Sequence, residues 1–167
     1  MKPSELLERI ISGGQTGADR GGLDAGLELG LPIGGWCPKG RRAEDGQVPL
    51  KYPMREDDSK KYPARTLANV LEGDATVIFY FGNLELGSRY TRDMAARYQK
   101  HHKLVPLDLL DDTEAALGQV RPWLLGLRDH LGRPFVLNVA GNRESRAPGI
   151  GARTKTVVVT AVLGFAL

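Results

Sequence analysis

The feature that most constrains this fold is a glycine-rich turn that follows a short apolar run near the beginning of the sequence. Residues 12–19 read SGGQTGAD and come directly after Ile10 and Ile11. Glycines at the end of a strand let the backbone approach a ligand closely, and the free N–H groups of a following helix attract an anion. The turn therefore predicts a strand, a tight bend and a helix that together hold a phosphate-bearing small molecule.

A second glycine turn repeats this arrangement in the middle of the chain. It covers residues 82–91 and follows the apolar run VIFYF at 77–81. If the strands before the two turns are neighbours in a sheet, both turns face one crevice. The residues of the second turn expected to contact the ligand are Gly82, Gly87, Ser88 and Thr91.

Strand and helix patterns alternate along the sequence. Strands are expected at 9–12, 32–36, 75–81, 104–107 and 135–140, and helices at 17–29, 64–72, 90–102 and 113–130, the last interrupted by Pro122. A polar loop occupies 37–61, and 157–162 fits a strand or a helix, of which the helix completes the alternation. This order predicts an α/β fold with an open, doubly wound, mostly parallel sheet and a ligand beyond the carboxyl ends of its strands.

Composition narrows the choice of partners and location. The 167 residues, 41% of them hydrophobic, suit one domain, residues 1–167, and the net charge of +3 comes from scattered cations that do not favour nucleic acid. The apolar stretch at 157–167 is shorter than the ~18 residues of a membrane span, so we expect a buried or interface element and no membrane contact. Cys37 has no partner for a disulfide or a metal site, and no signal-like segment opens the chain. We therefore expect a cytoplasmic protein in which Cys37 is packed.

The usual dinucleotide fingerprint is met only in part. Ser12, Gly14 and Gly17 have the spacing of its three glycines, but no acidic residue directly follows the second strand to bind a ribose. Cations at that place favour a phosphate or another oxyanion over an unmodified ribose. No Walker A sequence is present, which argues against ATP hydrolysis of the P-loop type. The basic residues after the second strand are Lys39, Arg41 and Arg42.

At these residues the sequence resembles the molybdenum carrier family over nearly its whole length. The segments that carry the resemblance are ISGGQTGADRGGLD at 11–24, GGWCPKGRRAEDG at 34–46, the Tyr-Pro-x-Arg-Thr block at 62–66, GSRYT at 87–91 and LNVAG at 137–141. That family includes molybdenum cofactor carrier proteins and belongs to a Rossmann-like superfamily of small-ligand binders that also contains phosphoribohydrolases. One departure is Asn142, which stands where the resemblance implies a proline before Arg143.

The resemblance implies a Rossmann-like carrier that holds its ligand rather than transforming it. The implied ligand is the molybdenum cofactor (molybdopterin) or a molybdate or tungstate species, and the implied partners are molybdoenzymes or cofactor-synthesis proteins. A homo-oligomer, dimer or tetramer, is expected from the resemblance and from the apolar stretch at 157–167. No catalytic residue and no metal ligand are assigned. The expected contacts with the ligand are Gly13, Gly14, Gln15, Thr16, Gly17, Asp19, Lys39, Arg41, Arg42, Gly82, Gly87, Ser88, Thr91, Asn138, Gly141 and Arg143.

Two other functions compete with the carrier. A phosphoribohydrolase that cleaves nucleoside monophosphates needs an acid near the second turn, where this chain has Thr91; Glu85 replaces that acid only if the loop folds it into the crevice. A nucleotide-sensing regulator is the third hypothesis. Asp19 either stabilises a helix start, accepts hydrogen bonds from a pterin edge or holds a cation. His101 and His102 are expected to close a helix and receive no catalytic role.

Overall fold

Parallel strands form the central sheet of the computed structural model, which describes residues 1–110 and 113–165. Within this part of the chain the sheet has five strands in the order β2-β1-β9-β7-β8, and each neighbouring pair is parallel. Their bounds are Ile33–Gly34 for β2, Leu7–Ile11 for β1, Phe135–Gly141 for β9, Ala75–Tyr80 for β7 and His101–Pro106 for β8. The α/β fold predicted from the sequence, with its mostly parallel sheet, is confirmed.

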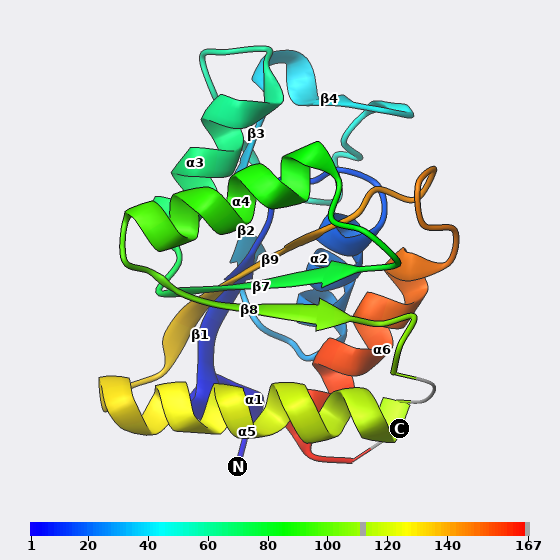
Figure 1. Cartoon of the computed structure of the whole chain (residues 1–167). Helices are drawn as coiled ribbons and strands as arrows, with labels where there is room; N and C mark the ends of the chain where they lie inside the picture. The colour runs from blue at the N-terminus through cyan, green and yellow to red at the C-terminus, as the bar shows by residue number, and fades with distance from the viewer. Residues whose placement is uncertain (111–112, 166–167) are drawn as a thin grey trace.

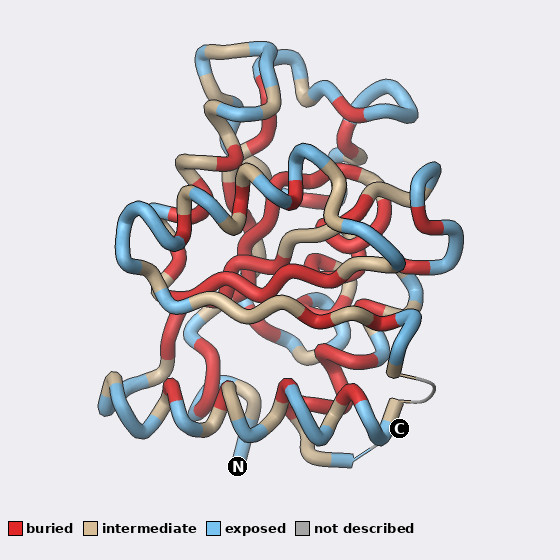
Figure 2. Tube along the Cα trace, in the orientation of Figure 1, coloured by how far each residue is buried: buried red, intermediate tan, exposed pale blue. Residues whose placement is uncertain are grey.

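Helices cover both faces of this sheet (Figure 1). One face carries α3 (Tyr62–Glu72) and α4 (Leu86–Arg97), and the other carries α1 (Pro3–Leu6), α2 (Ala18–Glu28), α5 (Thr113–Leu131) and α6 (Ile150–Leu163). The middle strands are therefore buried along most of their length (Figure 2). A strand covered on both faces needs a continuous apolar sequence, which explains why ATVIFY of β7 was the clearest strand to predict.

The expected polar loop at 37–61 contains short elements of its own. The pair β3 (Trp36–Cys37) and β6 (Arg55–Glu56) is parallel, and the hairpin β4 (Arg42–Ala43) and β5 (Gly46–Gln47) follows a 3-10 turn, η1 (Lys39–Arg41). A small second core forms beneath the loop from Leu23, Cys37, Ala43, Val48 and Tyr52. Cys37 is thus fully buried, as the sequence predicted.

Four local expectations are corrected. The two glycine turns do not follow neighbouring strands, because β9 lies between β1 and β7. The helix expected at 90–102 begins four residues earlier, as α4, since Gly87 and Ser88 form its first turn. It ends at Arg97, so His101 and His102 belong to β8 rather than to a helix end. Helix α5 runs through Pro122 without interruption.

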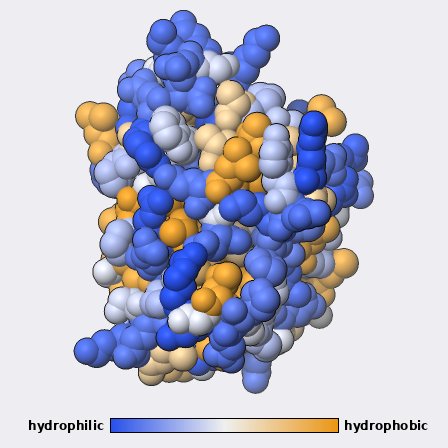
Figure 3. All heavy atoms as spheres, turned by 90° about the vertical axis from the view of Figure 1, so that its left-hand side faces the viewer, coloured by the Kyte–Doolittle hydropathy of each residue, from blue (hydrophilic) through white to orange (hydrophobic). Residues whose placement is uncertain are grey.

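The first part of the apolar stretch at 157–167 packs inside the domain. Residues 157–162 are helical, as favoured, and lie in α6 with exposed fractions of 3% or less. These six residues therefore offer no surface to a second copy, whereas Phe165 is 60% exposed. Residues 166–167 lie outside the described part, and the oligomer expected from the stretch 157–167 stays a prediction. Figure 3 shows apolar side chains only in small separate groups on the face that it displays. Among the described residues, none of the helices has the length and hydropathy that crossing a membrane requires.

Candidate functional site

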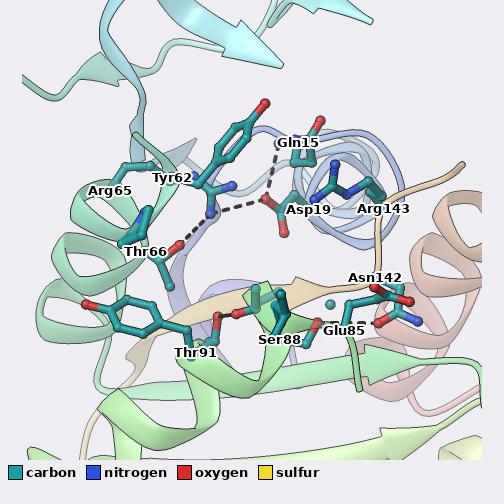
Figure 4. Close-up of a pocket in the computed structure, with 16 residues that line it drawn as sticks. Gln15, Asp19, Tyr62, Arg65, Thr66, Glu85, Ser88, Thr91, Asn142 and Arg143 are labelled. Atoms are coloured by element: carbon teal, nitrogen blue, oxygen red, sulfur yellow. Dashed lines mark hydrogen bonds and ion pairs between the residues drawn. The ribbon is translucent and has the colours of Figure 1, made fainter. Parts of the chain in front are cut away.

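A pocket of about 320 Å³ opens at the carboxyl edge of the sheet. It lies where β1, β9 and β7 end and where α2, α3 and α4 begin, the position at which open α/β sheets bind ligands (Figure 4). Seven of the expected ligand contacts line it. They are Gln15, Asp19, Gly87, Ser88, Thr91, Gly141 and Arg143.

The first glycine turn is closed by hydrogen bonds within the protein. The N–H of Gly14 donates to the Ser12 hydroxyl at 3.1 Å, and the N–H of Gln15 donates to Asp19 Oδ2 at 3.1 Å. The N–H of Thr16 donates to the Gln15 side-chain oxygen at 3.0 Å. The backbone donors of residues 14–16 are thus occupied, and a ligand would have to break these bonds to use them.

Asp19 supplies the negative charge that closes this turn. Its residue is 4% exposed and lies in the first turn of α2, facing the pocket from its upper side in Figure 4. Burial raises the pKa of the Asp19 carboxyl, against the opposing effects of the Arg65 guanidinium and the Gln15 N–H. The nearest charge contact is Arg65 Nη1, 4.0 Å from Oδ2.

Arg65 is the functional candidate that the sequence analysis did not assign. It comes from the first turns of α3, and its side chain is 13% exposed. Nη1 donates to the Thr66 hydroxyl at 2.8 Å, and the guanidinium lies 5.3 Å from the centre of the Tyr62 ring. Its Nε is buried and has no hydrogen-bond partner among the residues described. The signal was present in the block YPART, which places an arginine at a helix start marked by Pro63.

The second glycine turn is open toward the pocket. Glu85 is the N-cap of α4, and its side chain makes no capping bond with any described residue. The first N–H groups of a helix have no partner within the helix, and they carry the positive end of its dipole. Gly87 and Ser88, in this first turn, line the pocket. This helix start can therefore donate to an anion in the way that the sequence predicted for both turns.

The turn after β9 joins the two glycine turns. The Asn142 N–H donates to the Phe79 carbonyl at 3.0 Å, and the Asn142 carbonyl accepts from the Ala18 N–H at 3.1 Å. Proline, which lacks an N–H, could not make the first of these bonds. Gly141 is required here, because a Cβ would lie 2.0 Å from the Phe79 carbonyl oxygen. Arg143 follows at the pocket wall, with 40% of its side chain exposed and Nη1 3.9 Å from Glu44.

The predicted basic loop does not line the pocket. Arg41 is used structurally, donating through Nε and Nη2 to the carbonyls of Val48, Pro49 and Tyr52. Arg42 donates to the Lys60 carbonyl and lies 4.9 Å from the Tyr62 ring, one side chain away from the site. Lys39 is exposed in η1.

The remaining expected contacts lie around the pocket rather than at its wall. Gly82 donates its N–H to Asp108, and Gly14 lies inside the closed turn. Thr16 donates its hydroxyl to Glu44 and, with Gly17, lines a separate groove between α2 and α6. Gly13 and Asn138 line a small hollow that shares Asp19 and Arg65 with the main pocket.

Glu44 braces this region from outside the pocket. It accepts hydrogen bonds from the Thr16 hydroxyl and from the hydroxyl and N–H of Ser145. Burial opposes its ionisation, but the donors from Ser145 and Thr16 outweigh that effect and lower the pKa of Glu44. The ionised carboxylate thus ties the first turn to the segment after β9.

The pocket offers donors and charge rather than metal ligands. No group of three or more His, Cys, Asp or Glu side chains able to hold a metal ion occurs in the described ranges. Its polar surface includes two guanidinium groups, a helix start, hydroxyl groups and the carboxylates of Asp19 and Glu85. This set of groups suits a small molecule with an anionic end.

Comparisons with known proteins agree with this architecture. The model of the circularly permutated YpsA SLOG family matches residues 10–162. The chain is similar to the crystal structure of a "Putative molybdenum carrier protein" from Syntrophus aciditrophicus SB, with 38% identity and a TM-score of 0.85 over 95% of this chain and 96% of that one. No curated protein matches the sequence.

Proposed function

This chain belongs to the circularly permutated YpsA SLOG family, and from that premise we propose that it binds and carries an anionic, molybdenum-containing small molecule. The molybdenum cofactor is the ligand that we place first, with free molybdate or tungstate as simpler oxyanions of the same chemistry. The name of the similar crystal structure, a molybdenum carrier, supports the choice of metal.

One observation carries this proposal: Arg65, Arg143 and the open start of α4 line the same pocket. A phosphate or metal-oxo group placed among them gains charge-assisted hydrogen bonds, each contributing about 1.5–3 kcal/mol where water is excluded. Arg65 is mostly buried and can contribute at this level, whereas Arg143 is partly exposed and contributes less.

The hydroxyl groups of the pocket are arranged for binding rather than for attack. Thr91 donates to the Gly87 carbonyl at 2.9 Å, and Ser88 faces the Asn142 side-chain oxygen at 3.4 Å. Neither hydroxyl is paired with a base that would activate it as a nucleophile. Ground-state binding by these groups fits a carrier that releases its ligand unchanged.

A second function has one observation in its favour. Glu85 lines the pocket, so the loop brings into the crevice the acid that a nucleoside monophosphate hydrolase would need. The carrier remains our proposal because the other carboxylate of the pocket, Asp19, is engaged by the Gln15 N–H and lies beside Arg65, which leaves Glu85 without a second acid or base among the described pocket residues to assist it. Turnover of nucleoside monophosphates that Glu85→Gln abolishes would replace the carrier with the enzyme.

The direct test is the metal and pterin content of the purified protein. We expect molybdenum and pterin fluorescence to co-purify with the wild type and to be lost from Arg65→Ala. Arg92→Ala is the matched control, because Arg92 lies on α4 and pairs with Asp93 outside the pocket. Wild-type protein that is free of molybdenum and that gains none on incubation with molybdate or with the released cofactor would refute the proposal.

We extend the proposal to the setting of the protein. A carrier of this kind hands its ligand to molybdoenzymes or receives it from cofactor-synthesis proteins, and the cytoplasm is the proposed location. A homo-oligomer, dimer or tetramer, also stays a proposal, and light scattering at micromolar concentration measures it.

A further inference from the structure

A small hollow next to the pocket is lined by two residues that each have a buried polar atom without a partner among the described residues. Arg65 Nε is a donor and Asn138 Oδ1 is an acceptor, and neither makes a hydrogen bond within the described chain. Both residues line the hollow, together with Asp19. Asn138 itself is 2% exposed. Buried polar atoms are normally paired, so a hollow with two orphans is a place where an outside group completes the bonding.

The size of the hollow limits what that group can be. Its accessible volume is about 10 Å³, about the minimum that holds one water molecule, so a ligand ring cannot enter it. The ring has to stay in the 320 Å³ pocket, which shares Asp19, Arg65 and Thr66 with the hollow. A ligand can send only one polar atom into the hollow.

The donors and acceptors around the hollow select the chemistry of that atom. Asp19 and Asn138 present acceptors, and Arg65 Nε presents a donor. Asn138 is held in place because its Nδ2 donates to the Thr76 hydroxyl at 3.2 Å, which leaves Oδ1 as its unpaired atom. An amino group has two N–H donors for the two acceptors, and an acceptor beside it on a ring can take the Arg65 proton.

We propose that this hollow recognises the exocyclic amino group of a 2-amino-4-oxopyrimidine ring, the ring shared by pterins and guanine. The inference rests on the proposed function. It adds the part of the ligand that the protein recognises and the residues that recognise it. Asn138 and Asp19 accept from the amino group, and Arg65 donates to the neighbouring ring atom.

This assignment also orients the ligand. Asp19 repels an anionic group, so we place that group away from the hollow, among Arg143, the start of α4 and the terminal guanidinium nitrogens of Arg65, whose Nε is left for the ring. The ring then lies next to Tyr62, whose aromatic side chain lines the pocket and has the Arg42 and Arg65 guanidinium groups 4.9 and 5.3 Å from its ring centre. The pocket therefore separates a ring-reading end from an anion-binding end.

Two ligand pairs that differ at one exocyclic group test this inference on the wild-type protein. Pterin-6-carboxylate is compared with lumazine-6-carboxylate, which has an oxygen in place of the amino group, and GMP is compared with IMP, which lacks that group. We expect the amino member of at least one pair to bind about 10- to 100-fold more tightly, because its loss leaves buried acceptors unpaired. The pair with the larger ratio shows whether the ring comes from a pterin or from a guanine nucleotide.

Equal affinities within both pairs overturn the inference, and this is the result expected if the hollow holds only water. Failure of both pairs to bind also overturns it. Asn138→Leu and Asp19→Asn should reduce the ratio to a few-fold, with folding checked by thermal unfolding. Arg143→Ala should weaken both members of a pair by the same factor and keep the ratio.

The outcome is separable from that of the carrier proposal. Molybdenum binding without discrimination between the paired ligands would leave the carrier standing and refute only the amino-group site. Discrimination without any molybdenum binding would leave the amino-group site standing and refute the carrier.

Discussion

The two glycine turns have similar sequences but opposite roles. In the first, the side chains of Ser12, Asp19 and Gln15 accept the N–H groups of residues 14–16, so these donors already have partners within the protein. In the second, α4 begins without a side-chain cap and without an acidic residue in its first turn, within the described part of the chain. The comparison shows that glycines mark a sharp turn in both places. Whether the N–H groups of the turn are free to bind an anion depends on the side chains around it, such as Asp19 in the first turn.

Two arginines supply the positive charge of the pocket, and each has a carboxylate nearby. Arg65 lies beside Asp19, and Arg143 lies beside Glu44, so each pocket arginine is positioned near a carboxylate. Neither pair is a close ion pair, with separations of 4.0 and 3.9 Å. Both guanidinium groups can therefore still bind an anion that enters between the turns.

The largest expected effect is on stability, when one glycine in each turn is replaced by alanine. At Gly17 (φ 82°, ψ −130°) a Cβ would lie 2.4 Å from the Asn142 carbonyl oxygen, so Gly17→Ala should lower the free energy of unfolding by about 3 kcal/mol or more. At Gly87 no described atom lies within 4 Å of a Cβ, so Gly87→Ala should keep or raise stability. Urea unfolding measures both, and equal losses would contradict the contrast.

The next effect separates a binding arginine from a structural one. Arg65→Ala should weaken binding of an anionic ligand about 10- to 100-fold, because a mostly buried charge-assisted contact is lost. Arg41→Ala removes three hydrogen bonds to backbone carbonyls and should reduce stability while leaving the affinity of the remaining folded protein unchanged. Titration calorimetry below the melting temperature compares them, and the reverse pattern would restore the basic loop as the site.

A smaller effect is expected at Arg143. Its side chain is 40% exposed, so Arg143→Ala should weaken binding only about two- to fivefold. The remaining affinity should depend less on ionic strength than that of the wild type, since an exposed charge is screened by salt. Affinities at two salt concentrations test this, and an unchanged salt dependence would argue against contact with the anion.

The smallest effect concerns the carboxylate that closes the first turn. Burial raises the folded-state pKa of Asp19 above 3.8, so its ionisation reduces stability as the pH rises from that value through the folded pKa. Asp19→Asn lacks this cost, and its melting temperature relative to wild type should increase with pH over that range. Melting curves from pH 3.5 upward check the trend; a difference that is constant or falls with pH would contradict it.

Much of the fold could be predicted because it follows from local patterns. The apolar run of β7 and the alternation of strands with helices are short-range properties of the sequence. The insertion of β9 between β1 and β7 is a long-range choice of strand order, which no local pattern encodes. The start of α4 was misplaced because Gly87 and Ser88 looked like a loop.

The site was harder to predict than the fold. The glycine turns predicted Asp19 and Ser88 as ligand contacts, and both line the pocket, but the hydrogen bonds that close the first turn depend on side-chain direction. Arg65 follows a long loop, so its place in the pocket depends on how that loop ends. Arg41 was predicted as a ligand contact but donates to carbonyls of its own loop; the sequence does not separate these roles, because a cation on a loop can serve either.

The most direct test is a crystal structure of the protein with bound molybdate, in which anomalous scattering locates the metal. We expect a molybdenum peak in the pocket, within hydrogen-bonding reach through its oxygens of Arg65 and the N–H groups of Gly87 and Ser88, with the bonds of the first turn intact. A peak against the N–H groups of residues 14–17, with the Asp19 contact to Gln15 broken, would contradict this account.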